Sequence, residues 1–299
     1  MIGSKEIVCI GVCTFKRPIM LAACLDSLSR LALSNDRYEV MTVVADNEPE
    51  PNNRDIVGRF PRFRYVHEPR KGISNARNAA LDAAISAGAD WLAFIDDDEV
   101  ADPLWLSRLL SRAVETGADV VGGPVAFHYP KDYPAHLERR KWRFAPGSPT
   151  VTSNALISLG FLRKLDITPS FDPNLTASED QAFFAILREN GAVFEYANDA
   201  RVTETATVSR YSLWGSIKRS YNGGKRRAKL RGKSVALAAA LRLIGGPLKV
   251  VLSPLAIVAG IRAFTTVCYA GFKTTASGAG ALAGLLGAEP VFYKDIDGY

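Results

Sequence analysis

Residues 91–99 read WLAFIDDDE, a short apolar run followed by Asp96, Asp97, Asp98 and Glu99. The apolar run has the length and the aromatic and β-branched content of a buried strand. Carboxylates crowded at the tip of such a strand repel one another, and a bound cation would relieve that repulsion. Their hard oxygen atoms favour Mg²⁺ or Mn²⁺, which usually complete their coordination with substrate phosphates. The alternative is a solvated acidic turn before the next helix.

This stretch is one step in an alternation of strand-like and helix-like segments over the first two hundred residues. Strands are expected at 7–12, 39–45, 64–67, 91–95 and 120–121, with core structure returning at 153–162. Helices are expected at 18–31, 54–60, 73–87, 103–116 and 177–190, the last with Ser178 as its N-cap. Residues 124–150, which contain five prolines, are expected to be irregular. The alternation predicts an α/β fold with a mostly parallel sheet and helices on both of its faces.

Polar side chains follow three of the predicted strands, at the sheet edge where ligands of such folds bind. Thr14–Arg17 follows the first strand, Asp46 with Asn47 follows the second, and the aspartates follow the fourth. A carboxylate at Asp46 can accept hydrogen bonds from a ribose hydroxyl or a base N–H, although a solvated turn is equally natural there.

Two predicted helix starts carry further candidates. Gly72–Asn78 opens a helix whose N-terminal amides suit an anion, and Arg77 can pair with a phosphate or with the acidic cluster. An ordinary capped helix is the alternative reading. Glu179 and Asp180 lie in the first turn of the later helix, where a carboxylate could deprotonate a hydroxyl nucleophile. Acids at this position also stabilise the helix dipole, which is the simpler explanation for the pair on its own.

Taken together, these motifs resemble an inverting family 2 glycosyltransferase of the GT-A fold. The matching segments are Thr14–Pro18, Asp46-Asn47, Gly72–Asn78, the run from Phe94 to Glu99, and Ser178-Glu179-Asp180 followed by Phe183. The resemblance covers roughly residues 5–230 in the correct order. Within the family it is closest to bacterial exopolysaccharide glucosyltransferases of the succinoglycan type.

The resemblance implies a role for each matching residue. Thr14, Phe15, Arg17 and Asp46 would hold the uridine and ribose of a UDP-sugar, and Arg77 would help to offset the charge on the departing UDP. Asp96, with Asp97, would contact the nucleotide sugar, and Asp98 would bind the Mn²⁺ or Mg²⁺ that bridges the diphosphate. Asp180 would be the general base, with Glu179 beside it. Such a site transfers a hexosyl group, by this resemblance glucose, in one displacement with inversion.

One departure from the family pattern concerns the metal. Many members place a histidine after the base helix as a further ligand, but here the likely region is Val202–Thr205, and no histidine falls there. Glu204 is either a substitute oxygen ligand or a surface residue.

The charge distribution divides the chain. Residues 1–204 carry 23 Lys and Arg against 28 Asp and Glu, a net charge of −5, whereas Thr205–Ala288 has 13 Lys and Arg and no acidic residue. We expect a glycosyltransferase domain at 1–230 and an apolar, basic helical tail at 231–299. Between Arg210 and Lys233, aromatic and aliphatic residues at helical spacing predict a helix with one apolar and one basic face. Such a helix suits an anionic membrane surface; RNA binding and packing on the catalytic domain are the alternatives.

The segment 234–272 is strongly apolar but is interrupted by Arg242, Lys249 and Arg262 and by two prolines. Its uncharged stretches are shorter than a simple spanning helix needs, so half-inserted or re-entrant helices are expected, with a spanning helix as the alternative. A lipid-linked oligosaccharide acceptor would explain such a tail. The expected location is the cytoplasmic face of the inner membrane, with no nucleic-acid partner.

The four cysteines, Cys9, Cys13, Cys24 and Cys268, lack zinc spacing and are expected to be reduced, packed thiols. No signal-peptide pattern precedes the first strand. Two rival functions remain open at this stage. A metal-dependent nucleotidyltransferase would usually have a glycine-rich phosphate loop where Thr14–Pro18 stands. A non-catalytic, membrane-bound nucleotide-sugar-binding protein would not need every expected acidic group.

Overall fold

A computed structural model describes residues 5–33, 37–131, 141–148, 150–175, 179–206 and 212–289. The proposed N-cap Ser178 lies outside these residues. The chain divides into two compact units. Among the described residues, the first holds those up to His128 and from Lys141 to Thr205, and the second holds 129–131 and 206–289. The sequence prediction ended the first domain at residue 230 instead. The structure groups the helix 213–231 with the second unit because that helix packs on a later one.

A seven-stranded sheet forms the centre of the first unit. In spatial order its strands are β10 (Phe194–Tyr196), β6 (Val120–Gly122), β9 (Asn154–Ser158), β4 (Trp91–Asp96), β1 (Glu6–Thr14), β2 (Tyr38–Asp46) and β3 (Phe63–His67). Strands β4, β1, β2 and β3 are parallel neighbours, and β9 is antiparallel to both β4 and β6. The sheet is therefore mostly parallel, as the sequence predicts.

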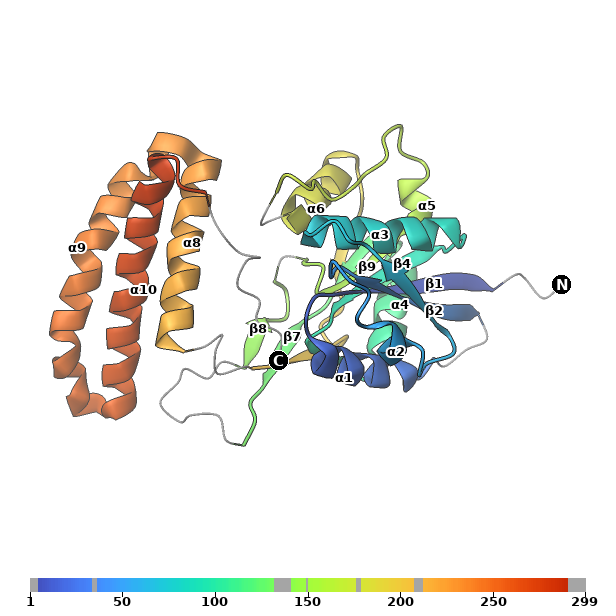
Figure 1. The fold of residues 1–299 in the computed structure, drawn as a ribbon, viewed down its shortest axis with the longest axis horizontal. Coiled ribbons are helices and arrows are strands. Elements are labelled where there is room, and N and C mark those ends of the chain that lie inside the picture. The colour runs from blue at the N-terminus through green and yellow to red at the C-terminus, as the bar shows by residue number, and fades with distance from the viewer. Residues whose placement is uncertain are drawn as a thin grey trace. The chain divides into compact units, whose positions relative to one another are not determined.

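Helices cover both faces of this sheet (Figure 1). One face carries α1 (Pro18–Ser29), α2 (Arg54–Val57) and α4 (Trp105–Thr116); the other carries α3 (Ile73–Ser86), α5 (Leu159–Leu162) and α6 (Glu179–Glu189). Alternate residues of β1 point to opposite faces, so Val8, Ile10 and Val12 pack in the α1 and α4 core while Cys9 packs in the other. All four are fully buried. Burial of these two cores fixes the sheet and hence the positions of the strand ends.

A second, four-stranded sheet lies beside the acidic strand end. Its order is β5 (Glu99–Ala101), β11 (Val202–Thr205), β7 (Val125–His128) and β8 (Trp142–Phe144). The expectation of an irregular 124–150 is therefore wrong for β7 and β8, which pair with each other. Residues 132–140 and 149 lie outside the described part. These strands have three or four residues each, which is too short for a hydrophobic alternation to reveal them.

The second unit consists of helices. They are α8 (Leu213–Arg231), η1 (Gly232–Val235), α9 (Ala236–Leu252), η2 (Ser253–Ala259) and α10 (Ile261–Leu285). Helix α10 packs against both α8 and α9 (Figure 1). A side chain at Gly280 would collide with the backbone of Tyr221 on α8, and one at Gly246 with Thr275 on α10. Glycine thus permits the close approach of these helices. Gly232–Ala259, with a mean hydropathy of 1.8, is one segment in the described part that is long and apolar enough to cross a membrane.

Candidate active site

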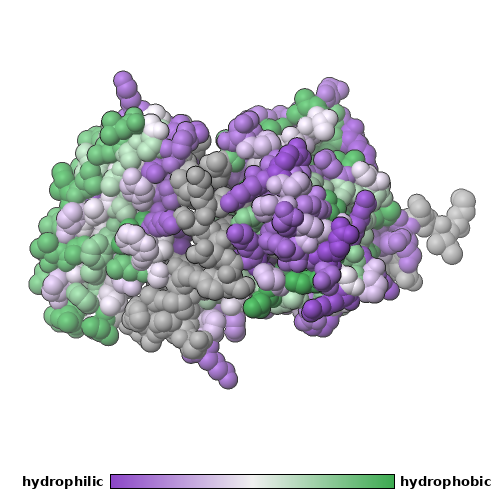
Figure 2. All heavy atoms as spheres, viewed as in Figure 1, coloured by the Kyte–Doolittle hydropathy of each residue, from purple (hydrophilic) through white to green (hydrophobic). Residues whose placement is uncertain are grey.

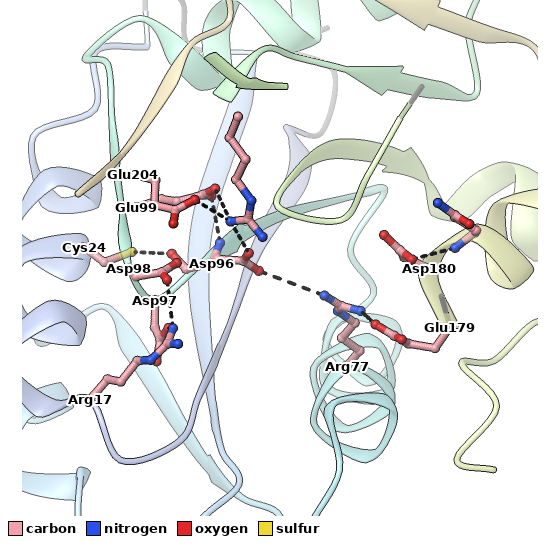
Figure 3. Close-up of polar contacts among 12 residues, drawn as sticks. Arg17, Cys24, Arg77, Asp96, Asp97, Asp98, Glu99, Glu179, Asp180 and Glu204 are labelled. Carbon is pink, nitrogen blue, oxygen red and sulfur yellow. Dashed lines mark hydrogen bonds and ion pairs between the residues drawn. The ribbon is translucent and has the colours of Figure 1, made fainter. Parts of the chain in front are cut away.

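The carboxyl ends of β1, β2 and β4 meet at one edge of the large sheet. Thr14 lies opposite Asp46 in the β1–β2 register, and Cys13 lies opposite Asp96 in the β1–β4 register. The sheet therefore brings together the three polar clusters that the sequence singles out. Figure 3 shows the resulting contacts, which run from Arg17 through the aspartates to Arg77 and on to Glu179.

Arg17, at the start of α1, neutralises the middle of the acidic run. Its Nη1 lies 3.0 Å from Asp97 Oδ1 and 2.9 Å from Asp98 Oδ2. The Thr14 hydroxyl donates to Asp97 Oδ2 over 2.8 Å. Burial raises the pKa of Asp97 to about 7, with Arg17 opposing the rise and Asp98 adding to it. Asp97 is therefore a buried carboxyl held by this strand end, and a solvated turn is excluded for it.

Arg143, on β8, is a member of the site that sequence reasoning missed. Its Nη1 lies 2.6 Å from Glu204 Oε2, 3.6 Å from Asp96 Oδ2 and 3.8 Å from Glu99 Oε1. Glu204 is only 1% exposed, so the surface alternative for it is wrong. Burial, and then Asp96, raises the pKa of Glu99 well above its usual range, while Arg143 lowers it. The small sheet thus adds one cation and one carboxylate to the strand end.

Arg77, near the start of α3, joins the acidic strand end to α6. Its Nη1 forms an ion pair with Glu179 Oε1, and its Nη2 lies 4.0 Å from Asp96 Oδ1. Arg77 and Glu179 are both buried. The sequence prediction named a phosphate or the acidic cluster as the partner of Arg77; the structure places it on Glu179, with Asp96 of the cluster 4.0 Å away. Asp180 is half-buried beside Glu179, and its Oδ1 accepts a hydrogen bond from the Gln181 amide over 2.8 Å (Figure 3).

Asp46 is fully buried, which excludes the solvated turn for this residue as well. Its Oδ2 accepts from the Tyr65 hydroxyl at 2.8 Å and the Asn53 amide at 3.1 Å, and its Oδ1 accepts from the Glu48 amide at 3.2 Å. An ionised carboxylate offers about four acceptor positions, so Asp46 retains capacity for roughly one more donor. Its main role in this structure is to fix the loop after β2.

The loop between β1 and α1 has an unusual backbone. Lys16 has a φ of 55°, in the left-handed region, and its amide donates to Glu48 Oε1 over 3.0 Å. This turn sets Phe15, whose ring has the Lys16 and Lys71 ammonium groups 5.6 and 4.9 Å from its centroid. The Phe15 ring is buried, so what this loop places next to the strand ends is the pair of lysine cations, which suits phosphates.

The carboxylates at this strand end suit a divalent metal ion that takes part of its coordination from a bound ligand. They suit a metal ion held by protein side chains alone less well. No three His, Cys, Asp or Glu side chains of the described ranges lie where they would hold a metal by themselves. The carboxylate oxygens are nonetheless hard donors, and Mg²⁺ or Mn²⁺ commonly takes only one or two carboxylates and completes its shell with phosphates. Glu99 Oε1, moreover, is buried and accepts no hydrogen bond within the part of the chain the structure describes. The residues present fit such an ion.

The fold and the acidic strand end define a class of site, in which an α/β sheet gathers carboxylates and arginines at the carboxyl ends of its strands. A family model, "Glycosyl transferase family 2", matches residues 9–165, more than half of the chain. The succinoglycan biosynthesis protein ExoM of Rhizobium meliloti is 34% identical over 233 residues, which cover 74% of each chain. The chain therefore belongs to glycosyltransferase family 2.

Solved structures agree on the fold. The mannosyltransferase PcManGT of Pyrobaculum calidifontis, solved with GDP-Man and Mn²⁺, matches with a TM-score of 0.59 at 16% identity, over 93% of this chain and 88% of its own. S. aureus TarS 1–349 in complex with UDP matches with a TM-score of 0.53 at 15% identity, over 93% and 91%. The first unit thus has the GT-A fold that the sequence predicts.

Proposed function

We propose that this glycosyltransferase transfers a hexosyl group, glucose, from a UDP-sugar to a hydroxyl of a growing, lipid-linked glycan, with inversion, in bacterial exopolysaccharide biosynthesis. The observation that carries the proposal is the acidic end of β4, enclosed by Arg17, Arg77 and Arg143 at the edge where three strand ends meet. The name of the ExoM relative supports the pathway, and the UDP in the S. aureus TarS structure supports the donor class.

In this proposal the loop after β1 binds the nucleotide. The buried Phe15 ring supports this loop, the ammonium groups over the ring meet the diphosphate, and Thr14 and Arg17 hold Asp97 in place for the sugar nucleotide. Asp46 supports the ribose site from below, by fixing the loop after β2 through its bonds to the Glu48 and Asn53 amides. Asp96, which is partly exposed at the end of the strand, contacts the donor sugar directly.

Asp98 would hold the Mn²⁺ or Mg²⁺, with the diphosphate completing the coordination, and Glu204 stays on Arg143. When bound, the ion supplies positive charge to the leaving diphosphate. Arg77, which pairs with Glu179 and lies 4.0 Å from Asp96, adds positive charge at the same strand end. Its pairing with Glu179 also fixes the start of α6.

Asp180 is the proposed general base. It lies in the first turn of α6, next to the Glu179–Arg77 ion pair, and unlike Glu179 it is partly exposed and has no ion-pair partner within the described ranges. A carboxylate there takes the proton from the acceptor hydroxyl as that oxygen attacks the anomeric carbon from the face opposite the diphosphate. The proton ends on Asp180, UDP leaves, and the anomeric configuration is inverted. Glu179 acts by positioning.

The helical second unit supports the location. We place the enzyme at the cytoplasmic face of the inner membrane on two features of the chain itself. Those features are the apolar segment Gly232–Ala259 and a tail without acidic residues up to Ala288.

The experiment is a transfer assay with the purified full chain, UDP-glucose, Mn²⁺ and a lipid-linked oligosaccharide acceptor, with NMR of the product to read the new linkage. We expect a β-linked product from the α-linked donor. Asp180→Asn should lower kcat by about 10²–10⁴-fold, and Glu189→Gln, exposed at the other end of α6, should leave it unchanged. Full activity of Asp180→Asn would remove the base assignment, and UDP binding without turnover on a broad acceptor panel would favour a binding protein.

A further inference from the structure

Helix α9 buries its small residues and exposes its large apolar ones, which is the reverse of what a helix of a soluble domain does. Its side toward α10 carries Ala239 and Gly246, and Ser253 follows seven residues later at the start of η2; all three are buried. The outward side of α9 and the start of η2 carry a row of large apolar side chains, each more than half exposed: Leu237, Leu241, Ile244, Leu248 and Val251 on α9, and Leu255 on η2. We call these six residues the α9 stripe. A helix of a soluble unit normally buries such a row and exposes the small residues.

The α9 stripe is continuous. Its members follow one another at spacings of three or four residues, so they lie on one face of the helix over its whole length and into η2. Exposed apolar residues of η2, among them Ile257 and Val258, extend it. Figure 2 shows hydrophobic residues gathered on the α9 side of the helical unit. A patch of this size on one helix marks a surface that another apolar phase covers.

Charge identifies that phase as a lipid surface. Arg242 and Lys249 each directly follow a stripe residue and are seven residues apart, so both lie on one flank of the stripe. The helical unit has no acidic residue between Ala206 and Ala288 that a second copy of these basic flanks could pair with. Anionic lipid headgroups supply the complementary charge along the whole row.

The same two charges decide the orientation of the helix. If Gly232–Ala259 crossed the bilayer, Arg242 and Lys249 would lie three to four residues on either side of its centre, where a charge is most costly. If α9 lies in the plane of the membrane, both side chains reach the phosphates while the stripe enters the acyl region. The small residues toward α10 serve helix packing in either case.

We propose that the α9 stripe is an in-plane membrane-docking surface, buried in one leaflet rich in anionic phospholipid, with Arg242 and Lys249 on the headgroups. This inference deepens the membrane location proposed above and rests on it. It assigns the contact to one face of one helix and excludes a spanning helix.

Vesicle co-sedimentation of the full chain tests the surface. On phosphatidylcholine vesicles containing about one third phosphatidylglycerol, Leu241→Glu with Leu248→Glu should weaken partition at least about tenfold. The matched control, Ile19→Glu with Val114→Glu, changes exposed apolar residues of the first unit and should bind as the unaltered chain does. The proposal is overturned if the stripe variant binds vesicles as well as the unaltered chain does. It is also overturned if light scattering shows that the substitutions convert a dimer to a monomer without any loss of vesicle binding.

Depth measurements test the orientation. A fluorescent label is placed on a new cysteine at Leu237, Leu248 or Leu255, in a Cys268→Ser chain, and quenched by lipids carrying a nitroxide near the headgroup or near the bilayer centre. In-plane docking predicts that the shallow nitroxide quenches all three positions best. If the deep nitroxide quenches the label at position 248 best while the shallow nitroxide quenches the labels at positions 237 and 255 best, the helix spans the bilayer and the proposal is overturned.

Release of UDP from UDP-glucose in vesicle-free solution keeps the two proposals apart. The stripe variant should still release UDP from UDP-glucose although it no longer binds vesicles, because the α9 stripe lies outside the catalytic unit. A chain that binds vesicles through the stripe but never turns over donor contradicts the proposed function alone. A chain that turns over donor but ignores vesicles contradicts the docking surface alone.

Discussion

Arg143→Met is the substitution for which the structure makes the sharpest quantitative prediction. The variant keeps most of the side-chain volume but removes the guanidinium that pairs with Glu204 and lies 3.8 Å from Glu99. These two carboxylates are 0% and 1% exposed in their side chains. Removing one partner of a buried ion pair typically costs about 3–5 kcal/mol. Because the Arg143 side chain is itself 23% exposed, we expect a loss of about 2–3 kcal/mol.

The chain offers a matched control at another ion pair of the same length. Arg112 Nη2 also lies 2.6 Å from a carboxylate, Glu195 Oε2, but these side chains are 40% and 33% exposed. Arg112→Met should therefore cost at most about 1 kcal/mol. Urea unfolding followed by tryptophan fluorescence measures both, since Trp105 is fully buried in the first unit.

The double variant Arg143→Met with Glu204→Gln sharpens this test. Removing the charge of Glu204 should recover part of the loss, because the buried carboxylate that pairs with Arg143 is then neutral. Equal destabilisation by Arg143→Met and Arg112→Met, with no recovery in the double variant, would refute the view that Arg143 is the internal countercharge of this strand end.

Three further predictions concern the same unit. Tyr65→Phe should cost about 1 kcal/mol in urea unfolding, because the buried Asp46 carboxylate loses one of its donors; no loss would mean that the Asn53 and Glu48 amides suffice. Lys16→Gly should unfold at equal or higher urea than the unaltered chain and Lys16→Val at lower urea, since the φ of 55° suits glycine and not a β-branched residue; the reverse order would contradict the left-handed turn. Burial raises the pKa of Cys9 to about 12, so its thiolate fraction at pH 8 is about a thousandfold below that of an ordinary thiol. Iodoacetamide should spare Cys9 in the folded chain at pH 8 and label it in urea, as mass spectrometry of the peptides can read; rapid labelling of the folded chain would contradict its burial.

The large sheet and its strand ends follow from the sequence because they are local. Each of β1, β2 and β4 is a continuous apolar run with polar residues directly after it, and parallel strands joined by helices place those residues at one edge. The antiparallel β9 was expected only as returning core structure, since its partners β4 and β6 are far away along the chain.

Arg143 and Glu204 could not be found in the same way. Each lies on a strand of three or four residues, and they meet only because β7 pairs with both β8 and β11. Such pairings join segments tens of residues apart, and no local pattern reports them. One signal was present in the sequence: Glu204 alternates with Val202 on a short run, which suggests that a charged residue is being buried with a partner.

The sequence prediction placed the boundary after residue 230, beyond α8, whereas the structure groups α8 with the second unit, and the reason is related. The basic, aromatic run of α8 reads as an amphipathic helix wherever it packs, and sequence periodicity does not choose its partner. The structure packs it on α10 through positions such as Gly280. Close helix approach at glycine depends on both helices at once.

The central claim is that the acidic end of β4 binds UDP through a shared divalent cation, and calorimetric titration of UDP into the full chain tests it most directly. With Mn²⁺ present, UDP should bind at least about tenfold more tightly than in EDTA, and Asp98→Asn should abolish the difference while Glu189→Gln keeps it. Identical UDP affinity with and without Mn²⁺ in the unaltered chain, or an unchanged Mn²⁺ effect in Asp98→Asn, would contradict the account.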